Sequence, residues 1–397
     1  MSENLASLFL LDPEVTFLNH GSYGACPRPV FEAYQRWQLQ LERQPVAFLD
    51  FNRGLSGWLR DARVAMAAEI GTAPDNIVGL TNATVGLNIV AQSLDLKPGD
   101  EILTTDHEYA ALEKTWAYVA RRTGARIVTV SIPLPLTTEA QFTEAVVAGL
   151  TDRTRVLFLS HITSATALLF PIERAVAEAR ARGIWTVIDG AHTPGHIPLN
   201  LDALGADFYA GNCHKWLMAP KGSAFLHVRP EWQAMINPLV ISHGWTEDAN
   251  RPGAKGVFGN TPFIDGLEMQ GTRDPAAWLT VPAAIEFRRQ HGWDKVAAQC
   301  RDLVQETAAR VARMTGLPAF SSPAFCAPQM VAMPVPACDP LELQRGLMAR
   351  HGIEIPCFTW KEHTIVRVSA QGYNTQSQMD LLVTSLAELL PRLAKAG

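Results

Sequence analysis

The stretch Ala210-Gly-Asn-Cys-His-Lys-Trp-Leu217 decides the fold assignment. It follows a short apolar segment at 207–210 that we predict to be a strand, so Lys215 is expected in a loop at a strand end. Lysine forms imines with carbonyl compounds when its surroundings deprotonate the amine. For a single lysine a solvated surface position is the commoner explanation, so the flanking sequence has to decide.

A second motif, Ile188-Asp-Gly-Ala-His192, ends the apolar segment 185–188. A carboxylate at a strand tip can keep the pyridine nitrogen of a cofactor protonated, which makes that ring an electron sink. His192 can reach the same ring or its phenolic oxygen. Asp-Gly pairs are also frequent in turns and caps, and for Asp189 taken alone this is the stronger explanation.

A third motif, Gly79-Leu-Thr-Asn-Ala-Thr-Val-Gly-Leu-Asn88, leads from small and hydroxyl residues into a helical pattern. Backbone N–H groups at such a helix start form a cradle for phosphate. A plain helix cap is the alternative, because Asn and Thr are favoured there in any case. The order along the chain is therefore phosphate cradle, aspartate and lysine, each at a predicted strand end.

The remaining periodicity predicts an α/β fold with a mainly parallel sheet, because short apolar strands alternate with amphipathic helices. In such sheets ligands lie outside the carboxyl ends of the strands. We expect residues 1–275 to form an N-terminal segment and large domain, and 276–397 a linking helix and a small C-terminal α/β domain. A Gly/Pro-rich segment at 245–272 is expected to be a long loop. The predicted strands are 101–105, 126–131, 155–160, 185–189, 207–210, 224–228, 330–334 and 363–369; the predicted helices are 85–93, 110–122, 139–150, 173–182, 276–313, 340–350 and a last one from 376.

Composition excludes several classes of protein. The 397 residues are 47% hydrophobic with a net charge of −5, which predicts a globular chain that binds no nucleic acid. No membrane span or secretion signal is expected, and six scattered cysteines without a Cys-x-x-Cys pair fit the cytoplasm. The glycine motifs of nicotinamide and P-loop enzymes are absent. A zinc site built on His192 and His196 is opposed by the intervening Pro194, so no metal is expected.

The combined motifs resemble the class V aminotransferase family, pyridoxal-5′-phosphate (PLP) enzymes of fold type I with the aspartate aminotransferase fold. Within it they look most like the isopenicillin N epimerase group, to which the hercynylcysteine sulfoxide lyases are similar. The resemblance covers nearly the whole chain. It is carried by residues 18–24, 105–110, 160–164, 211–216, 270–274 and 366–371.

This resemblance implies that PLP is bound as an imine of Lys215, with Asp189 on the pyridinium and His192 beside the ring. Tyr109, or else His107, would stack on the ring, although Tyr109 is equally explained as a half-buried residue at a helix start. The other implied contacts are Ala83, Thr84 and His214 to the phosphate, Thr163 to the phenolic oxygen, and Thr272 of the partner subunit to the phosphate, which implies a homodimer.

Arg367 is the expected anchor for a substrate carboxylate. It lies in the alternating segment Ile365-Val-Arg-Val-Ser369, where its planar guanidinium could bind a carboxylate with two hydrogen bonds. A surface salt bridge is the alternative, and the resemblance favours the anchor. Asn19 and His20, with Tyr373, are expected to line the substrate cleft.

The resulting hypothesis is an enzyme acting at Cα of an α-amino acid, with Lys215 and Tyr109 as catalytic residues. In an epimerase Lys215 removes the Cα proton and a second acid, Tyr109 or His20, returns one to the opposite face. In a C–S lyase the same carbanion expels a β-substituent instead. Desulfurase chemistry would need a nucleophilic cysteine, and the apolar neighbours of Cys357 favour a packing role. Aminotransfer is the remaining alternative.

Overall fold

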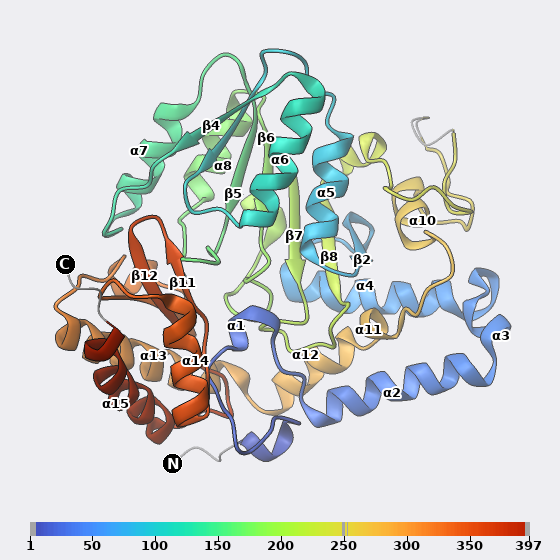
Figure 1. Ribbon diagram of the computed structural model, residues 1–397. Coiled ribbons are helices and arrows are strands. Elements are labelled where there is room, and N and C mark those ends of the chain that lie inside the picture. Colours follow the sequence, from blue (N-terminus) through green and yellow to red (C-terminus); the bar gives the residue numbers. More distant parts are fainter. Residues whose placement is uncertain (1–4, 248–250, 252, 394–397) are drawn as a thin grey trace.

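A seven-stranded sheet forms the centre of the computed structural model, which describes residues 5–247, 251 and 253–393 (Figure 1). Its order is β2-β8-β7-β6-β5-β3-β4, and β8 runs in the direction opposite to the other six strands. This confirms the mainly parallel sheet predicted from the sequence. The strands are β2 (Ile77–Leu80), β3 (Glu101–Thr105), β4 (Arg126–Val130), β5 (Thr154–Ser160), β6 (Trp185–Asp189), β7 (Phe208–Asn212) and β8 (Ala224–Val228).

Both faces of this sheet are covered by helices, because successive strand residues point to opposite faces. In β5, Val156 and Phe158 join a core formed with α5, α6 and α10, while Leu157 and Leu159 join the core formed with α4, α7, α8 and α12. The covering helices are α4 (Ser56–Ile70), α5 (Ala83–Ser93), α6 (Ala110–Thr123), α7 (Glu139–Gly149), α8 (Glu173–Ala181), α10 (Pro262–Glu268) and α12 (Val281–Gln290).

The C-terminal part of the chain has its own apolar core and a three-stranded antiparallel sheet of order β11-β12-β9. It lies below the carboxyl-end side of the large sheet in Figure 1, in orange and red. Its elements are β9 (Met330–Val335), β10 (Ile353–Glu354), β11 (Cys357–Trp360), β12 (His363–Ser369), α13 (Trp293–Thr315), α14 (Pro340–His351) and α15 (Gln376–Leu393).

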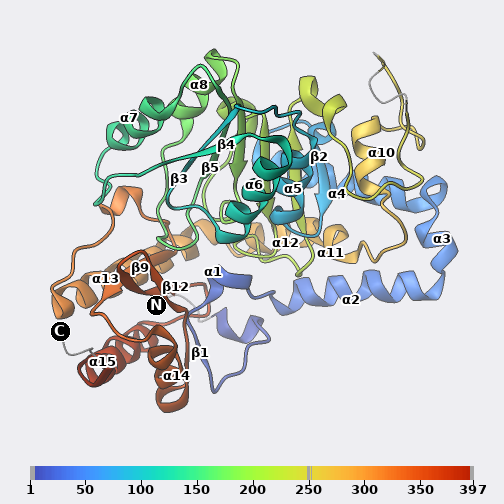
Figure 2. The ribbon, with the colours of Figure 1, turned by 45° about the horizontal axis from the view of Figure 1, so that its top comes forward.

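The N-terminal segment connects the two parts. Strand β1 (Thr16–Phe17) pairs in parallel with β10, and Asn19 forms a β-bridge with Ser369 at the end of β12. The next residues form the short helix α1 (His20–Tyr23), which lies between the small sheet and the large domain (Figure 2). The remaining helices are α2 (Arg28–Arg43), α3 (Pro45–Leu49), α9 (Leu201–Leu204) and α11 (Ala276–Leu279).

Two sequence-based expectations need correction. The segment 245–272 is not all loop, because Thr261 caps α10 and Pro262 opens it; residues 248–250 and 252 of this segment lie outside the described residues. The single helix expected at 276–313 is divided into α11, α12 and α13. Within the described ranges, no helix is both long and apolar enough to cross a membrane.

Gly24 is the residue that lets the N-terminal segment approach the Lys215 loop. Its φ is +69°, and a Cβ at this position would lie 2.0 Å from the backbone oxygen of His214. We expect Gly24→Ala to lower the free energy of unfolding by at least about 2 kcal/mol, because the clash is with backbone that cannot rotate away. Urea unfolding followed by circular dichroism measures this change.

Gly57→Ala is the matched control, since Gly57 lies in α4 with nothing within 4 Å of its added Cβ. It should be neutral or slightly stabilising, because alanine favours helix more than glycine does. Equal destabilisation by both substitutions would contradict the account of Gly24.

Candidate active site

A cavity of about 530 Å³ lies at the carboxyl ends of the parallel strands. Its walls come from the loops after β2, β3, β5, β6 and β7, from the N-terminal segment and from β12 of the small domain. This is the position that open α/β sheets use for ligands. The lining includes Ser22, Tyr23, Ala83, Thr84, Tyr109, Ser160, Ser164, Asp189, His192, Asn212, His214, Lys215, Lys221 and Arg367.

The Lys215 amine and the His192 imidazole are in hydrogen-bond contact, with 2.9 Å between Nζ and Nε2. The indole N–H of Trp216, which can only donate, lies 3.3 Å from Nδ1 of His192. In a neutral imidazole Nδ1 is then the acceptor and Nε2 carries the hydrogen. His192 therefore donates to Lys215, and the amine accepts with its lone pair.

The electrostatics of Lys215 agree with a neutral amine. Burial, together with the positive charge of Arg367, lowers the pKa of Lys215 to about 7, although the charge of Asp189 acts in the opposite direction. Burial also holds the pKa of His192 well below its ordinary value. Near neutral pH a substantial fraction of this lysine is therefore uncharged, which is the form that reacts with carbonyl carbon.

Asp189 ends β6 and is only 5% exposed. One carboxylate oxygen accepts from the backbone N–H of Ala191 at 2.9 Å, and the side chain borders the cavity. Burial raises the pKa of Asp189, while this hydrogen bond and Lys215 oppose the rise. A cationic N–H in the cavity would favour the charged carboxylate, so the residue fits a pyridinium partner.

The start of α5 faces the cavity and brings partial positive charge with it. Asn82 caps the helix by accepting from the N–H of Val85 at 2.8 Å. The N–H of Ala83, one of the expected phosphate contacts, instead donates to the side-chain oxygen of Asn212 at 2.8 Å. Thr84 lines the cavity with its neighbours.

His214 points to the same end of the cavity as Lys221. Its Nδ1 lies 3.2 Å from the backbone oxygen of Ser223, so Nδ1 carries the hydrogen in the neutral ring. Burial and the charge of Lys215 lower the pKa of His214 to about 4. A phosphate beside Nε2 would raise this pKa, because an anion stabilises the imidazolium form.

Arg367 projects from β12 into the cavity and is 5% exposed. Its guanidinium donates to the backbone oxygen of Ser164 and to the hydroxyl of Ser22, at 2.9 Å for the latter. Both partners are neutral, Nε has no partner, and no carboxylate in the described part of the chain pairs with the group. The surface salt bridge considered as the alternative is therefore not formed. A carboxylate that enters the cavity would pair with this buried cation and neutralise its charge.

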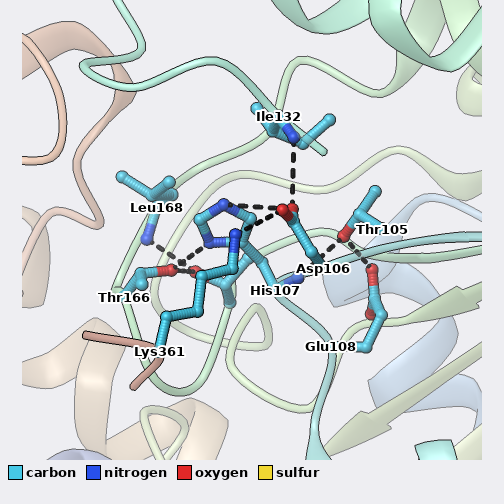
Figure 3. Close-up of polar contacts among 9 residues, drawn as sticks. Thr105, Asp106, His107, Glu108, Ile132, Thr166, Leu168 and Lys361 are labelled. Atoms are coloured by element: carbon cyan, nitrogen blue, oxygen red, sulfur yellow. Dashed lines mark hydrogen bonds and ion pairs between the residues drawn. The ribbon is translucent and has the colours of Figure 1, made fainter. Parts of the chain in front are cut away.

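Tyr109 and His107 have different surroundings in the structure. Tyr109 stands at the start of α6, borders the cavity and is 45% exposed. His107 is fully buried outside the cavity lining, 2.8 Å from the hydroxyl of Thr166 and 4.6 Å from the ring of Trp360 (Figure 3). Of the two aromatic residues expected to stack on a bound ring, only Tyr109 is accessible from the cavity.

Several other expected contacts lie outside the cavity. The hydroxyl of Thr163 pairs with Thr166 at 2.8 Å and accepts from the N–H of Leu168. Thr272 borders a different, small cavity beside Glu268 and Arg273. The carboxamide of Asn19 bonds to Glu354 and Ser22. Asn19 therefore supports the cavity wall from behind and does not line the cavity.

His20 is buried behind the lysine. Nδ1 contacts the hydroxyl of Tyr373 at 2.9 Å, and Nε2 contacts the backbone oxygen of Lys215 at 3.1 Å. Burial lowers the pKa of His20 to about 3. Neither His20 nor Tyr373 borders the cavity, so both hold the lysine loop in position.

Two further expectations concern metals and thiols. In the ranges that the structure describes, no group of His, Cys, Asp or Glu is arranged to hold a metal ion. Cys357 is buried, burial raises the pKa of its thiol, and it lies outside the cavity. These properties suit a packing residue and not a nucleophile.

The sequence reasoning gave no role to several residues that line the cavity, among them Ser22, Ser164, Asn212 and Lys221. Asn212 was detectable in principle, since it lies within the lysine motif at the end of β7. Ser22 carries no such signal, because its contact with Arg367 joins residues far apart in the chain.

Comparisons with known proteins agree with this geometry. The family described as Aminotransferase class-V matches residues 26–382. An isopenicillin N epimerase of Streptomyces clavuligerus is 37% identical over 98% of both chains. An L-cysteine desulfhydrase of Arabidopsis thaliana is 28% identical over 95% of this chain and 88% of its own length. A solved cysteine desulfurase of Escherichia coli has the same fold, with a TM-score of 0.82, 24% identity and 98% of both chains covered.

The family match spans most of the chain, and the fold, the strand-end lysine and the strand-end aspartate all agree with it. This protein therefore belongs to the class V aminotransferases, a family of PLP-dependent enzymes.

Proposed function

We propose that this enzyme acts at Cα of an α-amino acid and returns the proton there, as an epimerase or racemase. The observation that carries the proposal is that a lysine amine in contact with His192 and a buried guanidinium without a carboxylate partner in the described ranges border one cavity. The amine suits proton transfer at Cα, and the guanidinium suits the α-carboxylate. Epimerisation is preferred because a relative 37% identical over the full chain is an isopenicillin N epimerase.

The residues in the cavity fit PLP. Asp189 offers a carboxylate for the pyridinium, His192 lies beside the amine of Lys215, and His214, Lys221 and the start of α5 provide positive charge for the phosphate. In this proposal Ala83 and Thr84 contribute the helix start, and Tyr109 packs on the ring. When bound, PLP withdraws electrons from Cα and so makes its proton acidic.

The chain's own groups then have separate tasks. Arg367 binds the carboxylate with its planar fork, which fixes the orientation of Cα. Lys215 takes the Cα proton, since a group with a pKa of about 7 can both accept and return a proton near neutral pH. Tyr109 is the proposed second acid, because its phenol borders the cavity while His20 does not.

Cysteine desulfhydrase or C–S lyase chemistry is the second candidate, and the relative from Arabidopsis thaliana favours it. The same lysine, aspartate and arginine would serve both reactions. A desulfurase that carries sulfur on a cysteine is less well supported, because the thiol of Cys357 is buried with a raised pKa.

We also propose a homodimer in which Thr272 of the partner subunit completes the phosphate site. In its own chain Thr272 is exposed and borders a cavity apart from the active site. An exposed position of this kind is free to contact another subunit.

Lys215→Ala should remove covalent cofactor binding. After incubation with PLP and reduction with borohydride, the wild-type chain should carry the cofactor mass on the peptide that contains Lys215, and the variant should carry none. Lys97→Ala is the control, because Lys97 is exposed, lies outside the cavity lining and pairs with Asp95 at 3.0 Å. Unchanged labelling of Lys215→Ala would refute the assignment.

The apoenzyme should reveal the lowered pKa of Lys215. An amine-directed reagent should label Lys215 with a midpoint near pH 7, well below the value of about 10.4 that is usual for lysine, since burial disfavours the charged form. Mass spectrometry of the labelled peptides gives the profile, with exposed lysines as internal references. A Lys215 midpoint above pH 9 would contradict a neutral amine.

Amino acids incubated with the holoenzyme in deuterated water distinguish the two reactions. Epimerisation should place deuterium at Cα, leave the carbon skeleton intact and erode optical purity, all measurable by NMR and chiral chromatography. Release of pyruvate with sulfide or a thiol would instead establish elimination and displace our proposal.

A further inference from the structure

A second cavity, of about 410 Å³, adjoins the first. Ser22, Tyr109, Ser164 and Arg367 border both, so the two spaces meet at the arginine that we assign to the carboxylate. Its volume lies within the range of roughly 300–1,000 Å³ that is usual for small-molecule sites. Nothing in the proposed reaction at Cα uses this space.

One wall of the second cavity is a single face of the small sheet. Phe358 pairs with Ile365, and the N–H of Arg367 bonds to the backbone oxygen of Pro356. Because side chains alternate along strands, Pro356, Phe358 and Trp360 share the face from which Arg367 projects. The carboxylate anchor and an apolar, aromatic wall are thus parts of the same hairpin.

This hairpin is fixed to the large domain by the cluster in Figure 3. Lys361, in the turn between β11 and β12, forms an ion pair with Asp106 at 2.5 Å, and Asp106 also accepts from the N–H of Ile132 at 3.1 Å. The ring of His107 lies 4.6 Å from that of Trp360. The wall is therefore held in place before any substrate arrives, which lowers the entropic cost of binding.

The opposite wall contains carboxyl groups, most of which are already satisfied. Asp106 is paired with Lys361, and Glu108 accepts hydrogen bonds from Ser160 and Thr105. Glu113 lies at the exposed edge, and Ala110 and Ala165 supply the rest of this side. The surface left for a ligand is mainly apolar.

We propose that the second cavity receives the side chain of the substrate and selects α-amino acids with long, mainly apolar side chains. This inference rests on the proposed function, since it takes Arg367 as the carboxylate anchor. A side chain as short as that of cysteine would end near Arg367 and leave the aromatic wall uncovered. Each further buried methylene should raise affinity about fourfold.

Filling the cavity tests the proposal. Ala165 borders the second cavity only, so Ala165→Leu should occupy it without touching the first, and Ala165→Ser is the matched control of nearly unchanged size. The holoenzymes are compared on L-alanine, L-norvaline, L-norleucine and L-2-aminooctanoate. The readout is kcat/KM for deuterium uptake at Cα.

For the wild type and Ala165→Ser, kcat/KM should rise with chain length. Ala165→Leu should lose tenfold or more on norleucine and 2-aminooctanoate, and less than threefold on alanine. No length dependence in the wild type, or equal losses on alanine and on the long substrates, would overturn the proposal.

Binding provides a second readout that needs no turnover. α-Methylnorleucine, which has no Cα hydrogen, should bind the wild type by calorimetry at least tenfold more tightly than 2-aminoisobutyrate. Phe358→Ala should reduce this ratio, which covers the case in which Ala165→Leu fails to fold. Preserved selectivity of binding without any deuterium uptake would overturn the proposed epimerase activity alone, whereas equal binding of both ligands would overturn the cavity assignment.

Discussion

The hydrogen bond between His192 and Lys215 is the interaction on which the rest of the site depends. A lysine amine in water is protonated near neutral pH and does not react with carbonyl carbon. Here the indole N–H of Trp216 donates to Nδ1 of His192, so the hydrogen of the neutral imidazole lies on Nε2. Nε2 then donates to the Lys215 amine, which accepts with its lone pair and is therefore uncharged. Partial burial favours the same uncharged state. The other cavity groups act on chemistry that this neutral amine makes possible.

Arg367, which also borders the cavity, is linked to Lys215 by its charge and through the N-terminal segment. Its charge lowers the pKa of Lys215, yet it has no anionic partner of its own in the described ranges. The N-terminal segment holds the two together, because Ser22 accepts from Arg367 while His20 contacts the backbone of Lys215. Gly24 permits this close approach. An amino-acid carboxylate would satisfy the arginine and remove part of its effect on the lysine.

Much of the fold and of the cofactor end of the site could be predicted from sequence, because strand ends of a parallel sheet converge and carry the motifs there. This rule places Asp189, His192 and Lys215 at the same edge of the sheet, whereas their expected roles came from the combined motifs and the family resemblance. Contacts between distant segments could not be predicted: the pairing of Ser22 with Arg367 needs the packing of α1 against β12. Thr163 follows a strand as expected, but a local turn directs its hydroxyl to Thr166. Tyr109 and His107 lie in the same loop, yet the side chain of Tyr109 borders the cavity and that of His107 does not.

The second cavity bears on which reaction follows the loss of the Cα proton. Elimination requires a leaving group at Cβ, which a cysteine-like substrate supplies on a short side chain. A long hydrocarbon side chain, which we propose for the second cavity, carries no leaving group, so elimination is closed to it. Under our proposal, the aromatic wall on the hairpin that bears Arg367 would select substrates that cannot undergo C–S cleavage. Epimerases and C–S lyases could then share one set of residues around Lys215. They would differ in the substrate that each selects.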